Sequence, residues 1–435
     1  MSGLVDASAT DFTAELVRRA IGDGAHAAQV TNVNLDRFEI DFSERKVDLL
    51  RSTANETTSL GVLRDGKRGS ATLNGRDPDD IDGALRTALL AADAGLADPA
   101  NAVAEASSLP PSRHGAEMAD RDAMIATVLA YIRELSERYP LIRTRNSTYT
   151  FFVKDTSFAN SLGVHQRQRR AWYQFGAMFS AKDGARATSF NYSGAASYVP
   201  FEQLLAVGTV GRLIEETLRS FDARPVSEKF IGDVILTPDC LFHLMFVFAR
   251  ALGGYEFLAG TSPYKEKRGE TIASPLFSLL NRPLAEDFPE GADFDGFGIP
   301  TADLDIVKDG RLDNFLVDFY IARRLKLPQT AGVWNFVVPA GERSLDDIIA
   351  GTRRGIILSR FSGGRPNSNL DFSGVAKNSF YVEDGEIRHA LTETMVTGSL
   401  QQLLKNIHAV SREQVNFGDH AYPYLAASGV TISAK

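Results

Sequence analysis

Cys240 and His243 are the residues whose types and spacing could do chemistry most directly, because they stand three positions apart. On a helix this spacing makes two side chains neighbours. A thiolate beside an imidazole is a nucleophile with its base, and the same two groups also bind soft metals. The alternative interpretation is a small buried Cys and a hydrogen-bonded core His. We favour the second, because apolar surroundings raise a thiol pKa and suppress the thiolate.

The segment that carries this pair predicts a buried helix. Thr237-Pro238-Asp239 has an N-cap residue followed by Pro at the first helical position, and Gly253-Gly254 marks the end. Between them, residues 241–248 are apolar apart from His243. A helix that is apolar on nearly every side is expected to be buried.

A polar loop follows this helix and offers candidate substrate-cleft residues, namely Gly260, Thr261, Ser262 and Tyr264. Ser262 would act as a nucleophile only beside an oriented base, and no G-x-S-x-G signature surrounds it. The simpler interpretation is a turn that only positions the backbone. The other histidines are scattered without zinc-ligand spacing, and His420, near the C-terminus, has no ligand partner on the predicted helix.

Composition excludes several classes of function. The chain has 435 residues and a net charge of −8, which argues against nucleic-acid binding through phosphate neutralisation. The single Cys excludes an internal disulfide framework and fits a reducing compartment. No signal peptide is visible, and no apolar run reaches membrane-spanning length. We therefore expect a cytoplasmic protein without membrane contact. Short basic clusters such as residues 167–170 predict mostly solvated surface.

The pattern along the chain predicts an α+β protein, with N-terminal α/β domains followed by a larger mixed, β-rich C-terminal domain. Residues 1–100 combine helices with a hairpin at Asp65-Gly66. An Ala-, Ser- and Pro-rich linker at residues 97–116 leads to a second α+β domain, residues 117–224. The third domain is residues 225–435, with Asp-Gly hairpins at residues 309–310 and 384–385.

Several motifs in the C-terminal half, with two more near the N-terminus, resemble those of the TldD/PmbA family. Their order and spacing carry the resemblance, which spans almost the whole chain. The stretches are residues 59–62, 66–71, 260–262, 273–276, 294–301, 307–312, 316–323, 371–374 and 380–387. Members of the family are linked to peptide maturation and described as modulators of DNA gyrase.

The resemblance also implies which branch of the family fits. TldD-like members carry a His-Glu-x-x-x-His helix and a late Cys ligand for zinc. Counting back from residues 260–262 places the three helix positions at Met245, Phe246 and Arg250. Met is a poor zinc ligand, Phe is none, and a permanently charged Arg repels the metal. Residues 411–435 contain no Cys. The chain therefore resembles the PmbA branch, also called TldE, without catalytic residues or metal ligands of its own.

Three functions follow as expectations. The resemblance implies a non-catalytic subunit of a zinc metallopeptidase complex that processes or degrades unfolded peptides, with zinc in a TldD-like partner of a heterodimer. Extended peptide would then be held in part by strand addition to a sheet edge. The first alternative is a homodimeric peptide-binding or scaffold protein. The second is a hydrolase with non-zinc chemistry, built on Cys240 and His243 or on Ser262.

Overall fold

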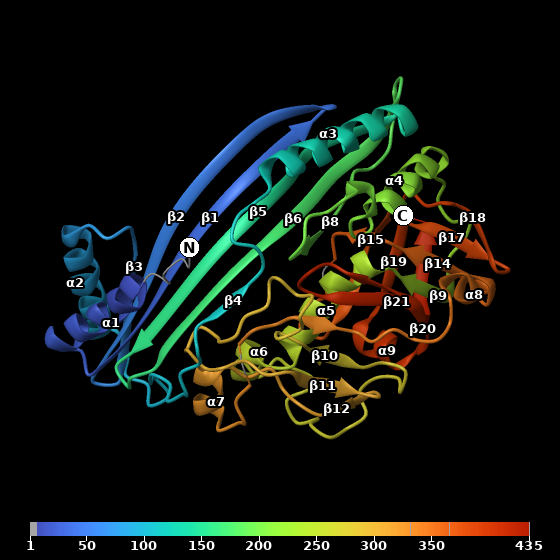
Figure 1. The fold of residues 1–435 in the computed structure, drawn as a ribbon. Coiled ribbons are helices and arrows are strands. Elements are labelled where there is room, and N and C mark those ends of the chain that lie inside the picture. Colours follow the sequence, from blue (N-terminus) through green and yellow to red (C-terminus); the bar gives the residue numbers. More distant parts are fainter. Residues whose placement is uncertain (1–6, 331, 365, 435) are drawn as a thin grey trace.

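Four long antiparallel strands form the centre of an N-terminal sheet in the computed structural model, which describes residues 7–330, 332–364 and 366–434 (Figure 1). They are β1 (Ala27–Ser43), β2 (Lys46–Arg64), β5 (Ile142–Asn160) and β6 (His165–Asp183). The sheet order is β3-β2-β1-β5-β6-β4, and β7 and β8 also pair with β6. The short strands are β3 (Lys67–Asn74), β4 (Ser112–His114), β7 (Arg186–Ala187) and β8 (Asn191–Ser197).

Two-residue turns join the first three strands. The predicted hairpin at Asp65-Gly66 is confirmed, with φ of 51° and 73°, and it joins β2 to β3. Glu44 and Arg45, with φ of 45° and 68°, make a similar turn between β1 and β2. Positive φ at both central residues is the geometry of the hairpin turn whose twist matches the strands.

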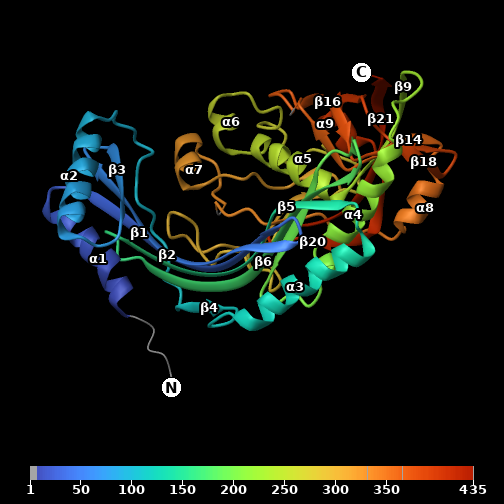
Figure 2. The same ribbon diagram turned by 90° about the horizontal axis from the view of Figure 1, so that it is seen from above.

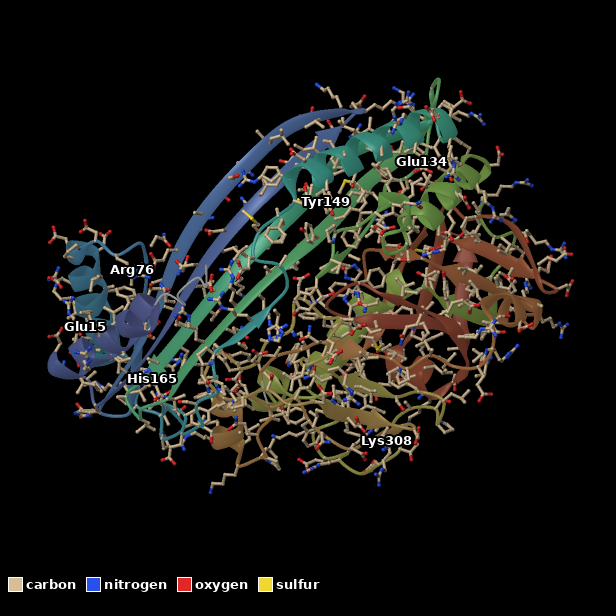
Figure 3. All side chains as sticks on the ribbon, in the orientation of Figure 1. Glu15, Arg76, Glu134, Tyr149, His165 and Lys308 are labelled. Carbon is tan, nitrogen blue, oxygen red and sulfur yellow. The ribbon has the colours of Figure 1, made fainter. Side chains whose placement is uncertain are left out.

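Helices cover one face of this sheet, and the two views show where each lies (Figures 1 and 2). Helices α1 (Ala7–Gly22) and α2 (Pro78–Ala94) lie at one end, and α3 (Arg121–Arg138) follows the convex side near the other. The first pair covers a core that includes Val30 and Leu60. A second core joins α3 and α4 (Val210–Arg219) to the other end of the sheet, with Tyr149 among its members (Figure 3). Two 3-10 turns, Leu204–Ala206 and Ser220–Asp222, flank α4.

The boundary predicted between residues 1–100 and 117–224 falls within one continuous sheet. Strand β1 pairs with β5 from Gln29–Asn160 to Phe42–Ser147, so both ranges contribute neighbouring strands. Each range nevertheless contributes to its own hydrophobic core. Their division into separate domains stays a prediction, as does the C-terminal domain at 225–435, and residues 1–6 and 435 lie outside the described residues.

The C-terminal part is built on a second, 13-stranded sheet. Its main path runs β12-β11-β10-β13-β21-β9-β14-β17-β18, with β15, β16, β19 and β20 joined off this path. The strands are β9 (Phe230–Leu236), β10 (Leu279–Asn281), β11 (Leu304–Lys308), β12 (Arg311–Leu312), β13 (Phe336–Val337), β14 (Arg354–Leu358), β15 (Arg360–Ser362), β16 (Asp371–Lys377), β17 (Phe380–Glu383), β18 (Glu386–Ala390), β19 (Thr394–Ser399), β20 (Ile407–Asn416) and β21 (Ala421–Ala434). The helices are α5 (Pro238–Ala251), α6 (Gly254–Leu258), α7 (Phe319–Leu325), α8 (Leu345–Ala350) and α9 (Leu400–Lys405). The predicted α+β class is confirmed.

Polar contacts join the N-terminal part of the chain to the C-terminal part. Arg170 of β6 is buried, and its guanidinium lies 2.6 Å from the Asp293 carboxylate of the C-terminal part. At the far end of the sheet, Tyr320 of α7 donates a 2.9 Å hydrogen bond to Asp98. Arg170 belongs to the basic cluster that the sequence predicted to be mostly solvated, and for this residue the prediction is wrong. A neighbouring acid on another element allows the guanidinium to be buried.

Candidate functional site

A cleft of about 850 Å³ lies between the N-terminal sheet and the C-terminal part. One wall is the sheet face opposite the helices, where Arg37, Glu39 and Asp41 of β1 alternate with the buried residues of the helix side. The other wall includes α5 and the segment before β21. From this wall come Asp239, Phe242, His243, Glu290, Ser359, Arg360, Phe417, Asp419 and His420.

Helix α5 contributes Asp239, Phe242 and His243 to the lining of the cleft. Its predicted start is confirmed, because Thr237 Oγ1 accepts a hydrogen bond from the Cys240 N–H at 3.3 Å. The predicted burial on nearly every side is wrong, because Phe242 is 39% and Phe246 47% exposed. Phe242 lines the cleft, and Phe246, one helical turn further along α5, packs edge-on against the Trp334 ring. The residues buried in the C-terminal core are Cys240, Leu241, Leu244, Met245, Phe248 and Ala249.

Aromatic rings line the α5 side of the cleft. The His420 ring lies 4.7 Å from the Phe242 ring and 4.7 Å from the Phe417 ring, centroid to centroid. Its Nδ1 is hydrogen-bonded to the Asp419 carboxylate. On the opposite wall, Tyr192 of β8 places its hydroxyl 3.2 Å from His243 Nε2. The histidines are therefore held by rings and hydrogen bonds in an aromatic wall suited to apolar side chains of a ligand.

Glu290 is the titratable group in the cleft with the most perturbed acidity. Its side chain is accessible from the cleft, yet the surrounding walls remove much of its water. Desolvation, with a smaller contribution from Asp419, raises the pKa of Glu290 to about 7, while Lys154 acts against this. A carboxyl group with this pKa changes its charge near neutral pH, so the charge of the cleft depends on pH there.

Arg360 and Ser359 line the cleft from the edge of the C-terminal sheet. The Arg360 guanidinium lies 4.4 Å from the Phe190 ring centroid and donates a 2.9 Å hydrogen bond to the Phe190 carbonyl. Burial lowers the pKa of Arg360. Ser359 is 3% exposed and its Oγ has no hydrogen-bond partner. Sequence reasoning missed Glu290, Arg360 and Asp419 because each is a single polar residue outside any spacing pattern.

The proposed pairing of Cys240 with His243 does not form. Cys240 is 2% exposed in the core, whereas His243 faces the cleft and Tyr192. Burial raises the pKa of the Cys240 thiol far above its ordinary value. A protonated thiol that is buried in the core, beside an imidazole that faces the cleft, is no nucleophile.

The loop after α6 is built as a turn and does not line the cleft. Gly260 has a φ of 68°, and the Thr261 N–H donates to the Glu256 carbonyl at 3.0 Å. Ser262 Oγ donates to the Ala251 carbonyl and accepts from the Tyr264 N–H. Tyr264 is 1% exposed and packs edge-on against Phe248. A substrate role for these four residues stays a prediction, and their observed contacts are those of a structural turn.

The three positions assigned to the degenerate zinc motif lie on different sides of α5. Met245 is wholly buried in the core, whereas Phe246 and Arg250 are exposed. Arg250 forms an ion pair with Glu256 at 2.6 Å. This alignment to the motif therefore stays a prediction. The residues of α5 that do line the cleft are Asp239, Phe242 and His243.

The residues around α5 do not fit a catalytic zinc ion, which requires three protein ligands and an open position. Across residues 7–330, 332–364 and 366–434, no three His, Cys, Asp or Glu side chains gather in a metal-binding group. The nearby carboxylate of Asp239 is occupied by Arg212 at 2.7 Å and by Thr209 at 2.6 Å. We derive no catalytic step through zinc on this chain.

Comparison with known proteins shows which class of protein this chain resembles. Residues 229–434 match the family model described as the PmbA/TldA metallopeptidase C-terminal domain. A metalloprotease PmbA homologue of Haemophilus influenzae is 24% identical over 420 residues, which cover 93% of this chain and 90% of that protein. Metalloprotease PmbA of Escherichia coli O157:H7 is 26% identical over 187 residues, 40% of this chain and 41% of that protein. The protein is thus metallopeptidase-like in its fold and sequence.

Solved structures agree with this class at the level of the fold. TldE from Thermococcus kodakarensis superposes with a TM-score of 0.85 at 19% identity, covering 97% of this chain and 99% of that one. A candidate modulator of DNA gyrase from Bacteroides thetaiotaomicron superposes with a TM-score of 0.89 at 21% identity, covering 99% and 100%. Residues 229–434 are therefore a domain of the PmbA/TldD family, and the chain as a whole is similar to PmbA homologues. Within the described residues, no helix has the length and apolar character needed to cross a membrane.

Proposed function

We propose that this chain is the PmbA-like, non-catalytic subunit of a cytoplasmic TldD/TldE-type peptidase complex that processes or degrades unfolded peptides. The observation that carries the proposal is the part of α5 that lines the cleft, where Phe242 and His243 stand on a helix of a metallopeptidase-like domain. A TldD-like partner would supply the zinc and the hydrolytic chemistry. In this heterodimer, the present chain would supply one wall of the substrate cleft.

The chemistry of the cleft supports peptide as its ligand. Rings of Phe242, Phe417 and His420 offer apolar surface on one wall. The other wall offers the polar side chains of Thr148, Thr150 and Gln174 from neighbouring strands. Alternating apolar and hydrogen-bonding surface suits an extended backbone with varied side chains, and it does not require one particular sequence.

The test is co-expression with a TldD-like subunit from the same organism, followed by size analysis and cleavage of an unfolded protein. We expect a one-to-one complex with peptidase activity that neither chain shows alone. Phe242→Asp should reduce cleavage while leaving the complex intact, because a carboxylate would replace an apolar cleft surface. Leu90→Asp is the matched control, because Leu90 is 68% exposed on α2, far along the chain from the cleft.

The homodimeric scaffold remains the second candidate, and the same experiment separates it. A stable dimer of this chain alone, with no association with any TldD-like subunit, would contradict the heterodimer and favour the scaffold. The non-zinc hydrolase loses its best residues, because Cys240 is buried and Ser262 is tied into a turn.

A further inference from the structure

Arg360 is a cation of the cleft that no acid neutralises within the described residues. The other arginines that line the cleft are Arg37 and Arg51, and both form ion pairs with Glu39. Arg360 is partly buried and has no carboxylate partner in residues 7–330, 332–364 and 366–434. Burial lowers its pKa, and only Tyr192 acts against this. A guanidinium taken out of water without a counter-charge is costly, so this position favours the binding of an anion.

Most of the hydrogen-bonding capacity of this guanidinium is unused. Each of its nitrogens can donate, yet only Nη2 does so within the described residues, to the Phe190 carbonyl. The Arg360 Nε has no hydrogen-bond partner. The hydroxyl of the preceding residue, Ser359, has none either, although this side chain is buried and lines the same cleft. Buried polar groups are normally hydrogen-bonded, so two adjacent residues with free donors indicate a ligand that accepts from both.

The surroundings hold the Arg360 guanidinium in place and add a second cation. Its central carbon lies 4.4 Å from the Phe190 ring centroid and 5.7 Å from the Tyr192 ring centroid. The register of β15 with β16 places Lys377 directly opposite Arg360, so the two side chains leave the same face of the sheet. Lys377 forms no ion pair within the described residues. Like charges directly opposite each other repel, and an anion bound beside them would relieve this repulsion.

We infer that Arg360 and Ser359 form a carboxylate-binding subsite of the cleft, and that its ligand is the free C-terminal carboxylate of a peptide. The inference rests on the proposed function, which makes peptide the ligand of the cleft. A carboxylate matches the guanidinium, because its two oxygens accept a parallel pair of N–H donors. The Ser359 hydroxyl donates to the same group. The Tyr192 ring beside Arg360 also lines the cleft, and it contacts the last side chain of the peptide.

The other charges of the cleft favour a single terminal carboxylate over a polyanion. Asp41, Glu290 and Asp419 also line the cleft, and a ligand with several phosphates would lie against them. A peptide has a neutral backbone and places one negative charge at its end. Ser359 is 3% exposed, so the subsite admits the end of a chain more readily than a segment that must continue on both sides.

The test compares two forms of the peptide Thr-Val-Gly-Ala-Ala-Leu, labelled with nitrobenzoxadiazole at the N-terminus, for binding to this chain alone by anisotropy. One form has a free C-terminal carboxylate and the other an amide. We expect the free acid to bind about tenfold more tightly, because the amide loses the charge-assisted hydrogen bonds. Arg360→Gln should remove this preference, and Arg360→Lys should keep part of it, because the charge remains without the planar fork. Arg388→Gln is the matched control, because Arg388 pairs with Glu386 and does not line the cleft.

A third peptide, the amide with Asp in place of the last Leu, separates a terminal carboxylate from a side-chain carboxylate. It should bind no better than the Leu amide, and binding as tight as that of the free acid would overturn the terminal assignment. Absence of any preference for the free acid in the unchanged protein would overturn the inference, and this comparison needs no variant to fold. A preference that survives Arg360→Gln would overturn it too. Because binding is measured on this chain alone, failure here is distinguishable from failure of the proposed function, which is measured by complex formation and cleavage.

Discussion

The buried ion pair between Arg170 and Asp293 should control how firmly the two sheets are joined beside the cleft. Arg170 is 5% exposed at its side chain and Asp293 14%. The guanidinium also donates to the Tyr198 hydroxyl at 2.7 Å and to the Phe288 carbonyl at 3.3 Å. Burial raises the pKa of Asp293, but the Ser112 hydroxyl and Arg170 outweigh it, and the pKa lies below its ordinary value.

The perturbation is Asp293→Asn, which keeps the size of the side chain and removes its charge. The Arg170 guanidinium would then be buried without a counter-charge, and this type of loss costs about 3–5 kcal/mol. The unfolding entropy of a chain this long is about 0.9 kcal/mol per degree, so Tm should fall by about 3–6 °C. The folded-state pKa of Asp293 is lowered, so the stability it contributes is present above its unfolded pKa and is lost as pH falls through the folded value.

The assay is thermal unfolding at neutral pH, with amide hydrogen exchange to locate the change. Asp93→Asn is the matched control, because its ion pair with Arg64 is exposed and exposed pairs contribute about 0–1 kcal/mol. Exchange should quicken in residues 288–301 and in the part of β6 around Arg170. The double variant Arg170→Met/Asp293→Asn should be more stable than Asp293→Asn alone, because it no longer buries an unpaired charge.

The reasoning would be refuted if Asp293→Asn had the same Tm as the Asp93→Asn control and the same amide hydrogen-exchange rates as the unchanged protein. A double variant no more stable than the single one would also contradict it. In either case, apolar packing rather than this ion pair would join the two sheets.

Three further predictions concern single sites. Glu290 gains its negative charge as pH rises through about 7, so a Lys-containing peptide should bind the cleft more tightly at about pH 8 than at about pH 6, and Glu290→Gln should remove this dependence in a titration. Gly298→Ala should lower the free energy of unfolding by about 2 kcal/mol or more, because φ at Gly298 is +78° and the new Cβ would lie 2.3 Å from the Phe158 ring. Gly296→Ala is the control. Its Cβ would meet open space, so its free energy of unfolding should equal that of the unchanged protein. Cys240 should react with a thiol reagent only after unfolding, because it is 2% exposed, and stoichiometric labelling of the native protein would contradict its burial.

Local sequence signals predict much of the secondary structure. Asp-Gly pairs located the hairpins at residues 65–66, 309–310 and 384–385, because positive φ is needed at such turns. Thr237 with Pro238 located the start of α5. These features depend on neighbouring residues, so a short window of sequence contains the cause.

The pairing of strands that are distant in the chain could not be predicted from such local signals. β1 and β5 pair although β2, β3, α2, β4 and α3 lie between them in the chain, and no short pattern encodes this choice. The apolar composition of α5 also misled the prediction of its burial. Phe242 lines the cleft and Phe246 is exposed, and an apolar residue looks the same in sequence whether it is exposed or lies in a core.

In the candidate site, too, local sequence signals predict one part and long-range packing decides the rest. The sequence placed α5 in the functional region, but the cleft also draws on Tyr192 and Glu290, which lie far from α5 in the chain. Their approach depends on how the two sheets are joined. The family resemblance was therefore the stronger guide to class, and the structure was needed to locate the cleft.

The zinc content of the two purified subunits, alone and in complex, tests the central claim most directly. We predict that the TldD-like subunit carries the zinc of the complex and that this chain, purified alone and dialysed against dilute zinc, retains none stoichiometrically. The aromatic wall on α5 and the ion-paired Asp239 leave too few ligands for a catalytic site. One tightly bound zinc per copy of this chain, lost on substitution of His243 or His420, would contradict the account.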